Sequence, residues 1–238
     1  MKIIKKLLSK CVFLGNFEDV IQYNKDNRGF EGSATANITI DVLCSMMTEG
    51  NGNPIERLAQ VNLFMLQSYN QECLDYNYQK MIGEMSQTSW ASSAGVGGRQ
   101  WTYQTCTEFG WYQSSNQPGN PFTDMFNVTF FENQCKDIFG VNFDLDLLNR
   151  GIARTNILYG AKHIQETNVV YVHGSFDPWH ALGIIEDNGP NKAILIPGTA
   201  HCANMYPASE NDPPQLKNAR IQIGKLIAEW LDSFVSNS

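Results

Sequence analysis

Apolar residues in the first third of the chain recur at the spacing of helices that bury one face. The first such stripe comprises Ile38, Val42, Leu43, Met46 and Met47. The stretch Asn53-Pro54-Ile55-Glu56 then supplies an N-cap residue, a first-turn proline and a capping-box acid, which predicts the start of a second helix. Its apolar stripe comprises Leu58, Val61, Met65 and Tyr69. Residues 1–85 are therefore predicted to be mainly helical, with these stripes in the core.

The pattern changes over residues 86–119, which are rich in Ser, Thr, Gly, Trp and Tyr. This composition favours loops and short strands over helix, so we place a domain boundary between residues 85 and 86. The segment is also dense in aromatic residues, namely Trp90, Trp101, Tyr103, Phe109, Trp111 and Tyr112. Such residues line apolar substrate pockets or pack beneath loops, and the sequence leaves both interpretations open.

Two short runs of β-branched residues, at 168–173 and 192–197, are bounded by turn residues and are typical of buried parallel strands. A helix is predicted to start at Asp212-Pro213. Its apolar positions, which fall on one face, are Leu216, Ala219, Ile223, Leu226, Trp230 and Phe234. Strand, loop, strand, loop and helix form the closing portion of a sheet in the α/β fold class, to which we assign residues 86–238.

The charge balance narrows the choice of partners. The chain carries 17 basic and 24 acidic residues, a net charge of −7. This argues against nucleic acid or an acidic membrane surface as a partner, because both favour basic surfaces. No apolar run approaches the roughly 20 residues that span a bilayer, so no integral membrane protein is expected. The six cysteines form no C-x-x-C pair, so we expect no metal site. No cofactor is expected either.

Several features indicate the secretory route. Asn37-Ile-Thr and Asn127-Val-Thr are acceptor sequences for N-glycosylation, and the cysteine count is even. The chain begins like the basic end of a signal peptide, but Lys10 interrupts the apolar stretch and no clean cleavage site follows. We therefore expect a lysosomal or secreted protein whose signal peptide lies in an upstream region missing from this sequence.

Ionisable residues follow both predicted strands: Asp177 lies in the first loop and His201 in the second. Catalytic groups of open parallel sheets gather beyond the carboxyl ends of the strands, and an acid followed by a histidine is the order of the hydrolase triad. In that triad the carboxylate fixes the imidazole tautomer and stabilises the imidazolium formed when the histidine takes the nucleophile's proton. On spacing alone, the alternative stays open that Asp177 caps a turn before Pro178 and that His201 has no special role.

Four separated stretches carry a family resemblance, and they read GNFEDVIQYNKDNR (15–28), RQWTYQTCTEFG (99–110), NVVYVHGSFDPWHALG (168–183) and GTAHCANMYP (198–207). Together they closely resemble the prolyl-carboxypeptidase, dipeptidyl peptidase II and thymus-specific serine protease family, and are nearest its thymus-specific branch. The resemblance implies a serine exopeptidase with an α/β-hydrolase fold, of which this chain is the carboxy-terminal part. Residues 1–85 would then belong to its helical cap domain.

The resemblance also implies roles for individual residues. Asp177 would be the charge-stabilising acid, His201 the general base, and Trp179 a wall of the apolar pocket that receives a proline-like side chain. A disulfide between Cys106 and Cys135 is implied because the family-like segment around Cys106 carries a bridge in its relatives. A peptide substrate is the expected partner, and whether the protein forms a homodimer stays open.

The family's nucleophilic serine lies in a Gly-Gly-Ser-Tyr-x-Gly turn upstream of the cap, whereas no G-x-S-x-G occurs in this chain. The nearest match is centred on Ser93, which has neither a strand-like sequence before it nor a good helix start after it, so we do not expect it to be a nucleophile. Two interpretations follow: a peptidase whose serine lies upstream, inactive as this chain alone, or a catalytically dead paralogue that still binds peptides. A hydrolase of another class, such as an esterase, is a third alternative.

The remaining polar residues near these motifs are expected to have ordinary roles. His173 and His180 are expected to pack or to form local hydrogen bonds, and Glu108 is expected to be solvated or to cap a helix. The side chain of Cys202, next to His201 in the sequence, is expected to point away from the histidine and to be buried.

Overall fold

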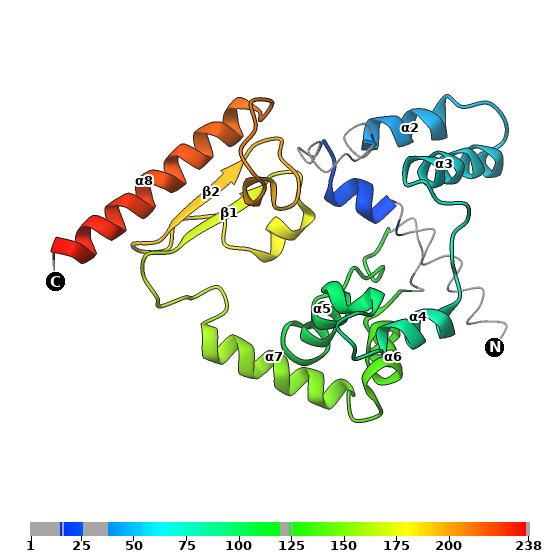
Figure 1. The fold of residues 1–238 in the computed structure, drawn as a ribbon, viewed down its shortest axis with the longest axis horizontal. Helices are drawn as coiled ribbons and strands as arrows, with labels where there is room; N and C mark the ends of the chain where they lie inside the picture. The colour runs from blue at the N-terminus through cyan, green and yellow to red at the C-terminus, as the bar shows by residue number, and fades with distance from the viewer. Residues whose placement is uncertain (1–14, 16, 26–37, 120–123, 125, 237–238) are drawn as a thin grey trace. The chain divides into compact units, whose positions relative to one another are not determined.

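The computed structural model of the protein describes residues 15, 17–25, 38–119, 124 and 126–236. Its elements, shown in Figure 1, are α2 (Ile40–Thr48), α3 (Pro54–Ser68), α4 (Tyr78–Met85), η3 (Ser93–Val96), α5 (Gly98–Gln104), η4 (Thr105–Phe109), α6 (Val128–Phe139), α7 (Leu145–Tyr159), β1 (Val170–Gly174), η5 (Pro178–Leu182), β2 (Lys192–Ile196), η6 (Ala203–Met205) and α8 (Pro214–Ser236). One compact unit contains Asp75–Ala161, and a second contains Gly15–Leu74 and Lys162–Ser238. The expected boundary between residues 85 and 86 falls inside the first unit, and the division into cap and hydrolase portions stays a prediction.

The elements in the described residues of the Asp75–Ala161 unit are all helical. The π-helix η4 is joined to α6 by the predicted disulfide between Cys106 and Cys135, whose Cα atoms are 5.8 Å apart. Helix α7 packs against η4 so closely that a Cβ atom at Gly151 would lie 2.0 Å from the carbonyl oxygen of Thr107. Glycine at position 151 is therefore required for these two elements to approach.

The expectation of loops and short strands over residues 86–119 is wrong for residues 93–109, which form η3, α5 and η4 in succession. Tertiary contacts outweigh the weak helix propensity of this composition. The guanidinium carbon of Arg99 lies 4.7 Å from the ring centre of Phe139, and the Tyr103 ring packs edge-on against the same ring. Together with the disulfide, these contacts hold α5 and η4 against α6.

The two helices predicted in the first third of the chain are confirmed as α2 and α3. The predicted capping box opens α3: the Asn53 side chain accepts the N–H of Glu56 at 3.1 Å, and the Glu56 carboxylate accepts the N–H of Asn53 at 2.8 Å. Apolar residues from these helices and from the segments before them form one hydrophobic core. Its buried members are Val20, Ile38, Leu43, Val61 and Met65.

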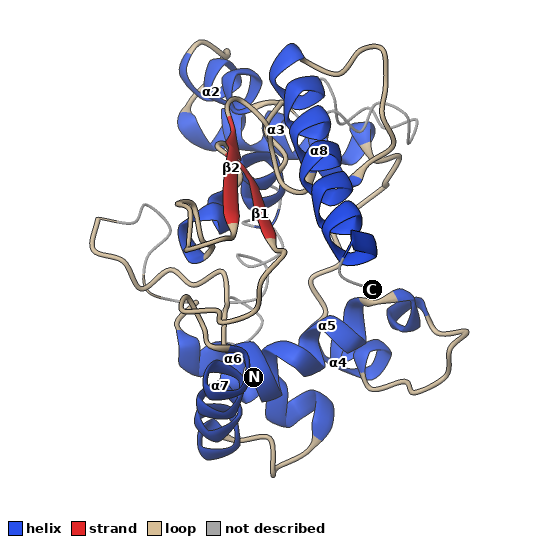
Figure 2. Ribbon diagram, turned by 90° about the vertical axis from the view of Figure 1, so that its left-hand side faces the viewer, coloured by secondary structure: helices blue, strands red, loops and turns tan. Residues whose placement is uncertain are grey.

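The sheet in the described part of the chain consists of β1 and β2, which pair in parallel with Val170 opposite Lys192. The parallel pairing confirms the prediction, although most strand residues are half-buried rather than buried. Helix α8 lies beside the strands (Figure 2) and packs on them through a second hydrophobic core. The buried members of this core are Ile196, Ala203, Leu216 and Ala219.

The apolar face predicted for the last helix is buried only near its start. Leu216 and Ala219 of α8 are buried, whereas Phe234 is 74% exposed.

None of the helices in the described residues is both long and apolar enough to cross a bilayer.

Backbone contacts bring together the loops that follow β1 and β2. The N–H of Phe176 donates to the carbonyl oxygen of Thr199 at 2.9 Å, and the N–H of Gly198 donates to Oγ of Ser175 at 2.8 Å. The approach is so close that a Cβ atom at Gly174 would lie 2.4 Å from the Thr199 carbonyl oxygen. The side chains of both loops therefore meet at the carboxyl edge of the strand pair.

Candidate active site

The carboxylate of Asp177 and the imidazole of His201 meet at this edge. Oδ2 of Asp177 lies 2.8 Å from Nδ1 of His201. Oδ1 accepts the backbone N–H of Trp179 at 2.9 Å, and Asp177 is only 5% exposed. Because both carboxylate oxygens have a hydrogen-bond partner, the orientation of the carboxylate is fixed, and it can orient the imidazole in turn.

The backbone of His201 is anchored at both of its polar groups. Its N–H donates to the carbonyl oxygen of Gln22 at 3.1 Å, and its carbonyl oxygen accepts from the hydroxyl of Tyr206 at 3.3 Å. The imidazole lies edge-on to the ring of Tyr23, with ring centres 5.7 Å apart. Since Nδ1 faces Asp177, Nε2 is the atom that a hydrolase nucleophile would meet.

The surroundings of His201 stabilise its protonated form and raise its pKa to about 9. The largest cause is a hydrogen bond with the side chain of Cys202; the hydrogen bond and charge of Asp177 act in the same direction, whereas burial opposes them. The expectation that Cys202 is buried and points away from the histidine is therefore wrong. Cys202 is half-buried, and its backbone φ of +58° is one that residues other than glycine rarely adopt.

Two further histidines lie near the carboxylate. Nδ1 of His180 is 2.6 Å from the carbonyl oxygen of Asp177. The His173 ring is packed against Gly183, where a Cβ atom would lie 2.1 Å from Cε1 of the ring. Burial lowers the pKa of His173 despite the nearby charge of Asp177. Both histidines thus make the local contacts expected of them, and no group of three or more metal-binding side chains occurs among the described residues.

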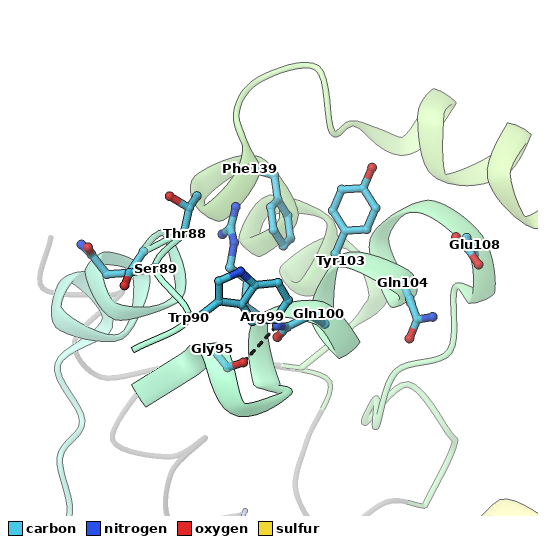
Figure 3. A pocket seen from close by; sticks show the side chains of 11 residues that line it. Thr88, Ser89, Trp90, Gly95, Arg99, Gln100, Tyr103, Gln104, Glu108 and Phe139 are labelled. Carbon is cyan, nitrogen blue, oxygen red and sulfur yellow. Dashed lines mark hydrogen bonds between the residues drawn. The ribbon is translucent and has the colours of Figure 1, made fainter. Parts of the chain in front are cut away.

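A separate cavity of about 420 Å³ lies within the Asp75–Ala161 unit (Figure 3). It is lined chiefly by aromatic and amide side chains, which are Gln87, Trp90, Gln100, Tyr103, Gln104 and Phe139. The carboxylate-bearing residue Glu108 also borders it. Other aromatic residues of the same segment pack internally, as Tyr112 does by stacking on Phe131 at 4.9 Å between ring centres. Aromatic residues of this segment thus both border a cavity and pack internally, and a role for the cavity in substrate binding stays a prediction.

Comparison with known proteins shows which family the chain that carries the Asp177–His201 pair is similar to. The family model described as Serine carboxypeptidase S28 matches residues 5–223. The chain belongs to this family of serine peptidases. The parallel strand pair, with an acid after one strand and a histidine after the next, is compatible with the family's α/β-hydrolase fold.

Individual S28 relatives confirm the resemblance seen in the sequence. The chain is 33% identical over 208 residues to the thymus-specific serine protease of Mus musculus, a match that covers 85% of this chain and 40% of the mouse protein. The human protein of the same name is 30% identical over 208 residues, with the same coverage. The lysosomal Pro-X carboxypeptidase of Bos taurus is 29% identical over 164 residues, or 67% of this chain and 31% of the bovine protein. The chain thus spans 40% of the length of the two thymus-specific relatives.

The other residues singled out in the sequence lie in several elements. Trp179 lies in η5, two positions after Asp177, with its ring centre 6.5 Å from that of His201. Asn127 is the N-cap of α6, where its side chain accepts a backbone N–H, while Asn37 lies outside the described residues. Ser93 begins the short helix η3, and the element before it is the helix α4 rather than a strand.

Sequence reasoning missed the part that residues 17–25 play in the site. Gln22 and Tyr23 both contact His201, although they lie far from it in the sequence. The one available signal was the family resemblance of the stretch 15–28, which pointed to no role for either residue.

We expect the His201 ring to titrate near pH 9 and the His173 ring below its usual 6.5. Asp177→Asn should lower the His201 pKa because it replaces the carboxylate, which stabilises the imidazolium, with a neutral amide, and Cys202→Ala should lower it because it removes a hydrogen-bond partner of the ring. Since the pKa of His201 is higher in the folded state, its contribution to stability is complete below about pH 6.5 and is lost as the pH rises to about 9. NMR titration of the ring resonances measures these values, and a His201 pKa at or below 6.5 would contradict the geometry.

Proposed function

We propose that this chain is the carboxy-terminal part of a serine-type exopeptidase that acts on peptides. Asp177 would be the acid that orients the base, and His201 would be the general base that takes the proton of a serine. Trp179 would form a wall of the pocket for the substrate side chain. The serine would come from polypeptide upstream of Met1.

The observation that carries this proposal is the 2.8 Å contact between Asp177 Oδ2 and His201 Nδ1 in loops after consecutive parallel strands. A carboxylate at Nδ1 keeps that nitrogen protonated, so that Nε2 is free to accept a proton. A general base must also be neutral, and the raised pKa of His201 opposes this. A nucleophile-bearing segment packed over the ring would bury it further, which lowers the pKa of a histidine.

The proposed enzyme would prefer peptide substrates that contain a proline-like residue. Trp179 presents an aromatic wall beside the imidazole, and flat apolar walls suit a pyrrolidine ring. The bovine relative is named a Pro-X carboxypeptidase. Whether the amino or the carboxyl end of the peptide is clamped would depend on residues that this proposal places upstream.

A lysosomal or secretory location is proposed on related grounds. The disulfide between Cys106 and Cys135 suits an oxidising compartment, and the bovine relative is named as lysosomal. Asn127 and Asn37 are the proposed glycosylation positions, with Asn127 half-buried at a helix start.

The second candidate function is peptide binding without turnover. It is favoured by the absence of a G-x-S-x-G sequence from the chain. An inactive paralogue would keep the Asp177–His201 contact and the Trp179 wall, because these positions also shape the surface that faces a peptide.

A fluorophosphonate probe separates the two candidates, since it labels only an activated serine. We expect no labelling of the 238-residue chain, because without the serine there is no acyl-enzyme. A longer polypeptide, extended upstream from the same gene, should be labelled and should cleave a prolyl dipeptide reporter. His201→Ala should abolish both signals.

Two other outcomes would overturn the proposal. Labelling and turnover by the 238-residue chain itself, lost in His201→Ala, would place the nucleophile inside the chain and return Ser93 to consideration. A folded longer polypeptide that binds the dipeptide but is never labelled would favour the binding function.

A further inference from the structure

We propose that Gln22 is a positioning residue that sets the orientation of Trp179 and thereby the affinity for the substrate side chain. This inference rests on the proposed function, because it deepens the role proposed for Trp179. It also makes a statement about the contact between two side chains that can be tested without any catalysis.

The side-chain contact is direct. Nε1 of Trp179 donates to Oε1 of Gln22 at 2.6 Å, across 157 positions of sequence. An indole has one N–H and no acceptor, so a single partner decides which way the ring is turned. A half-buried indole N–H that lost this partner would be left unsatisfied, which favours rotation of the ring toward another acceptor or toward water.

The same residue also contacts the base. The backbone carbonyl of Gln22 accepts the N–H of His201, and the next side chain, Tyr23, packs edge-on against the imidazole. Gln22 therefore links the loop of the base to the turn that carries the acid and the pocket wall.

The segment that bears Gln22 is itself held in place, which a positioning role requires. Val20 is buried in the core formed with α2 and α3. Oδ1 of Asn24 accepts the N–H of Ile40 at 3.0 Å, which ties the segment to the start of α2. Nζ of Lys25 lies 5.8 Å from the ring centre of Phe176, in the loop just before the acid. Anchors on both sides of Gln22 thus hold its side chain at the indole.

The side-chain contact of Gln22 with Trp179 and its backbone contact with His201 should affect different kinetic constants. A side-chain substitution removes the bond to Trp179 but keeps the backbone bond to His201. The pocket wall should then lose its fixed orientation, whereas the Asp177–His201 pair should stay in place. The substrate side chain would then bind less tightly in the ground state and in the transition state alike, so KM should rise while kcat changes little.

The test in the longer polypeptide compares Gln22→Met, which has a similar volume and no acceptor, with Gln22→Glu, which keeps an acceptor oxygen. For a prolyl dipeptide reporter we expect Gln22→Met to raise KM about tenfold and to change kcat less than about threefold. Gln22→Glu should restore part of the lost affinity. Gln67→Met, at an exposed position of α3, is the matched control and should leave both constants unchanged.

A second readout uses the 238-residue chain and needs no activity. In ¹⁵N NMR, with the indole signal assigned through Trp179→Phe, Gln22→Met should shift the Trp179 indole resonance and speed its exchange with solvent. Gln67→Met should do neither. An indole signal that is unchanged in a folded Gln22→Met chain overturns the inference, as does a fall of kcat with unchanged KM. If the wild-type longer polypeptide lacks all activity, the proposed function fails, and the indole signal still decides whether Gln22 positions Trp179.

Discussion

If His201 is the proposed general base, Asp177→Asn should lower the kcat of the longer polypeptide by about 10⁴-fold while KM changes little, as the same substitution does in a well-studied Ser-His-Asp triad. The amide of asparagine would present an N–H to Nδ1 of His201 where the carboxylate now accepts at 2.8 Å. Nδ1 would then have to become the acceptor, and the proton would move to Nε2. The histidine could no longer accept a proton from the serine, because its reactive nitrogen would already carry one.

Asp187→Asn is the matched control for this substitution. Asp187 lies between the same two strands, but it is exposed and pairs with Lys192 at 2.7 Å. Exposed ion pairs contribute little, so we expect less than about a twofold change in kcat. Steady-state kinetics of both variants on a prolyl dipeptide reporter makes the comparison. A loss for Asp177→Asn no larger than that of the control would mean that the Asp177–His201 contact is structural only.

Local rules were enough to predict several elements. The capping box at Asn53 and Glu56 forms as predicted because its hydrogen bonds join residues three positions apart. The strands at 170–174 and 192–196 were found because apolar, β-branched runs of this length have few alternatives when turn residues bound them. The order of Asp177 and His201 could be interpreted because parallel strands place their following loops at one edge of a sheet.

Composition alone could not predict the helices between residues 93 and 109. Their weak intrinsic propensity is offset by contacts with α6, which lies further along the chain: Arg99 stacks on Phe139, and Cys106 is bonded to Cys135. Compositional rules weigh only neighbours in the sequence, so such contacts are invisible to them.

Dependence on contacts and backbone geometry that local rules do not consider also explains why the role of Gln22 was missed and why the expectation for Cys202 was wrong. The bond from Trp179 to Gln22 spans 157 positions, and no periodicity of apolar residues reports a polar contact of that kind. Cys202 has a left-handed backbone conformation. Sequence rules expect this conformation at glycine or asparagine, so they did not indicate it at a cysteine. Without that conformation in view, the direction of the thiol beside His201 could not be inferred.

Replacing both cysteines of the disulfide with alanine should destabilise the Asp75–Ala161 unit by about 3–4 kcal/mol, the loop-closure value for residues separated by 29 positions. The alanines are small enough to avoid a clash at positions where Cys106 and Cys135 are 1% and 3% exposed. The loss should be concentrated in α5, η4 and α6, because η4 and α6 carry the bridged cysteines and α5 runs directly into η4. Hydrogen exchange measured by mass spectrometry on the whole chain should therefore show faster exchange in peptides from 98–109 and 128–139.

Cys73→Ala is the control, since Cys73 is an exposed free cysteine outside that unit. It should change stability by no more than about 0.5 kcal/mol. A reducing agent should reproduce the faster exchange in the wild-type chain and should have no effect on the variant that lacks both bridge cysteines. Wild-type exchange in the double variant would contradict the prediction, as would a reductant effect on it as large as on the wild type. The segment 98–112 would then be held on α6 by the Tyr112–Phe131 stack and the Arg99–Phe139 contact rather than by the disulfide.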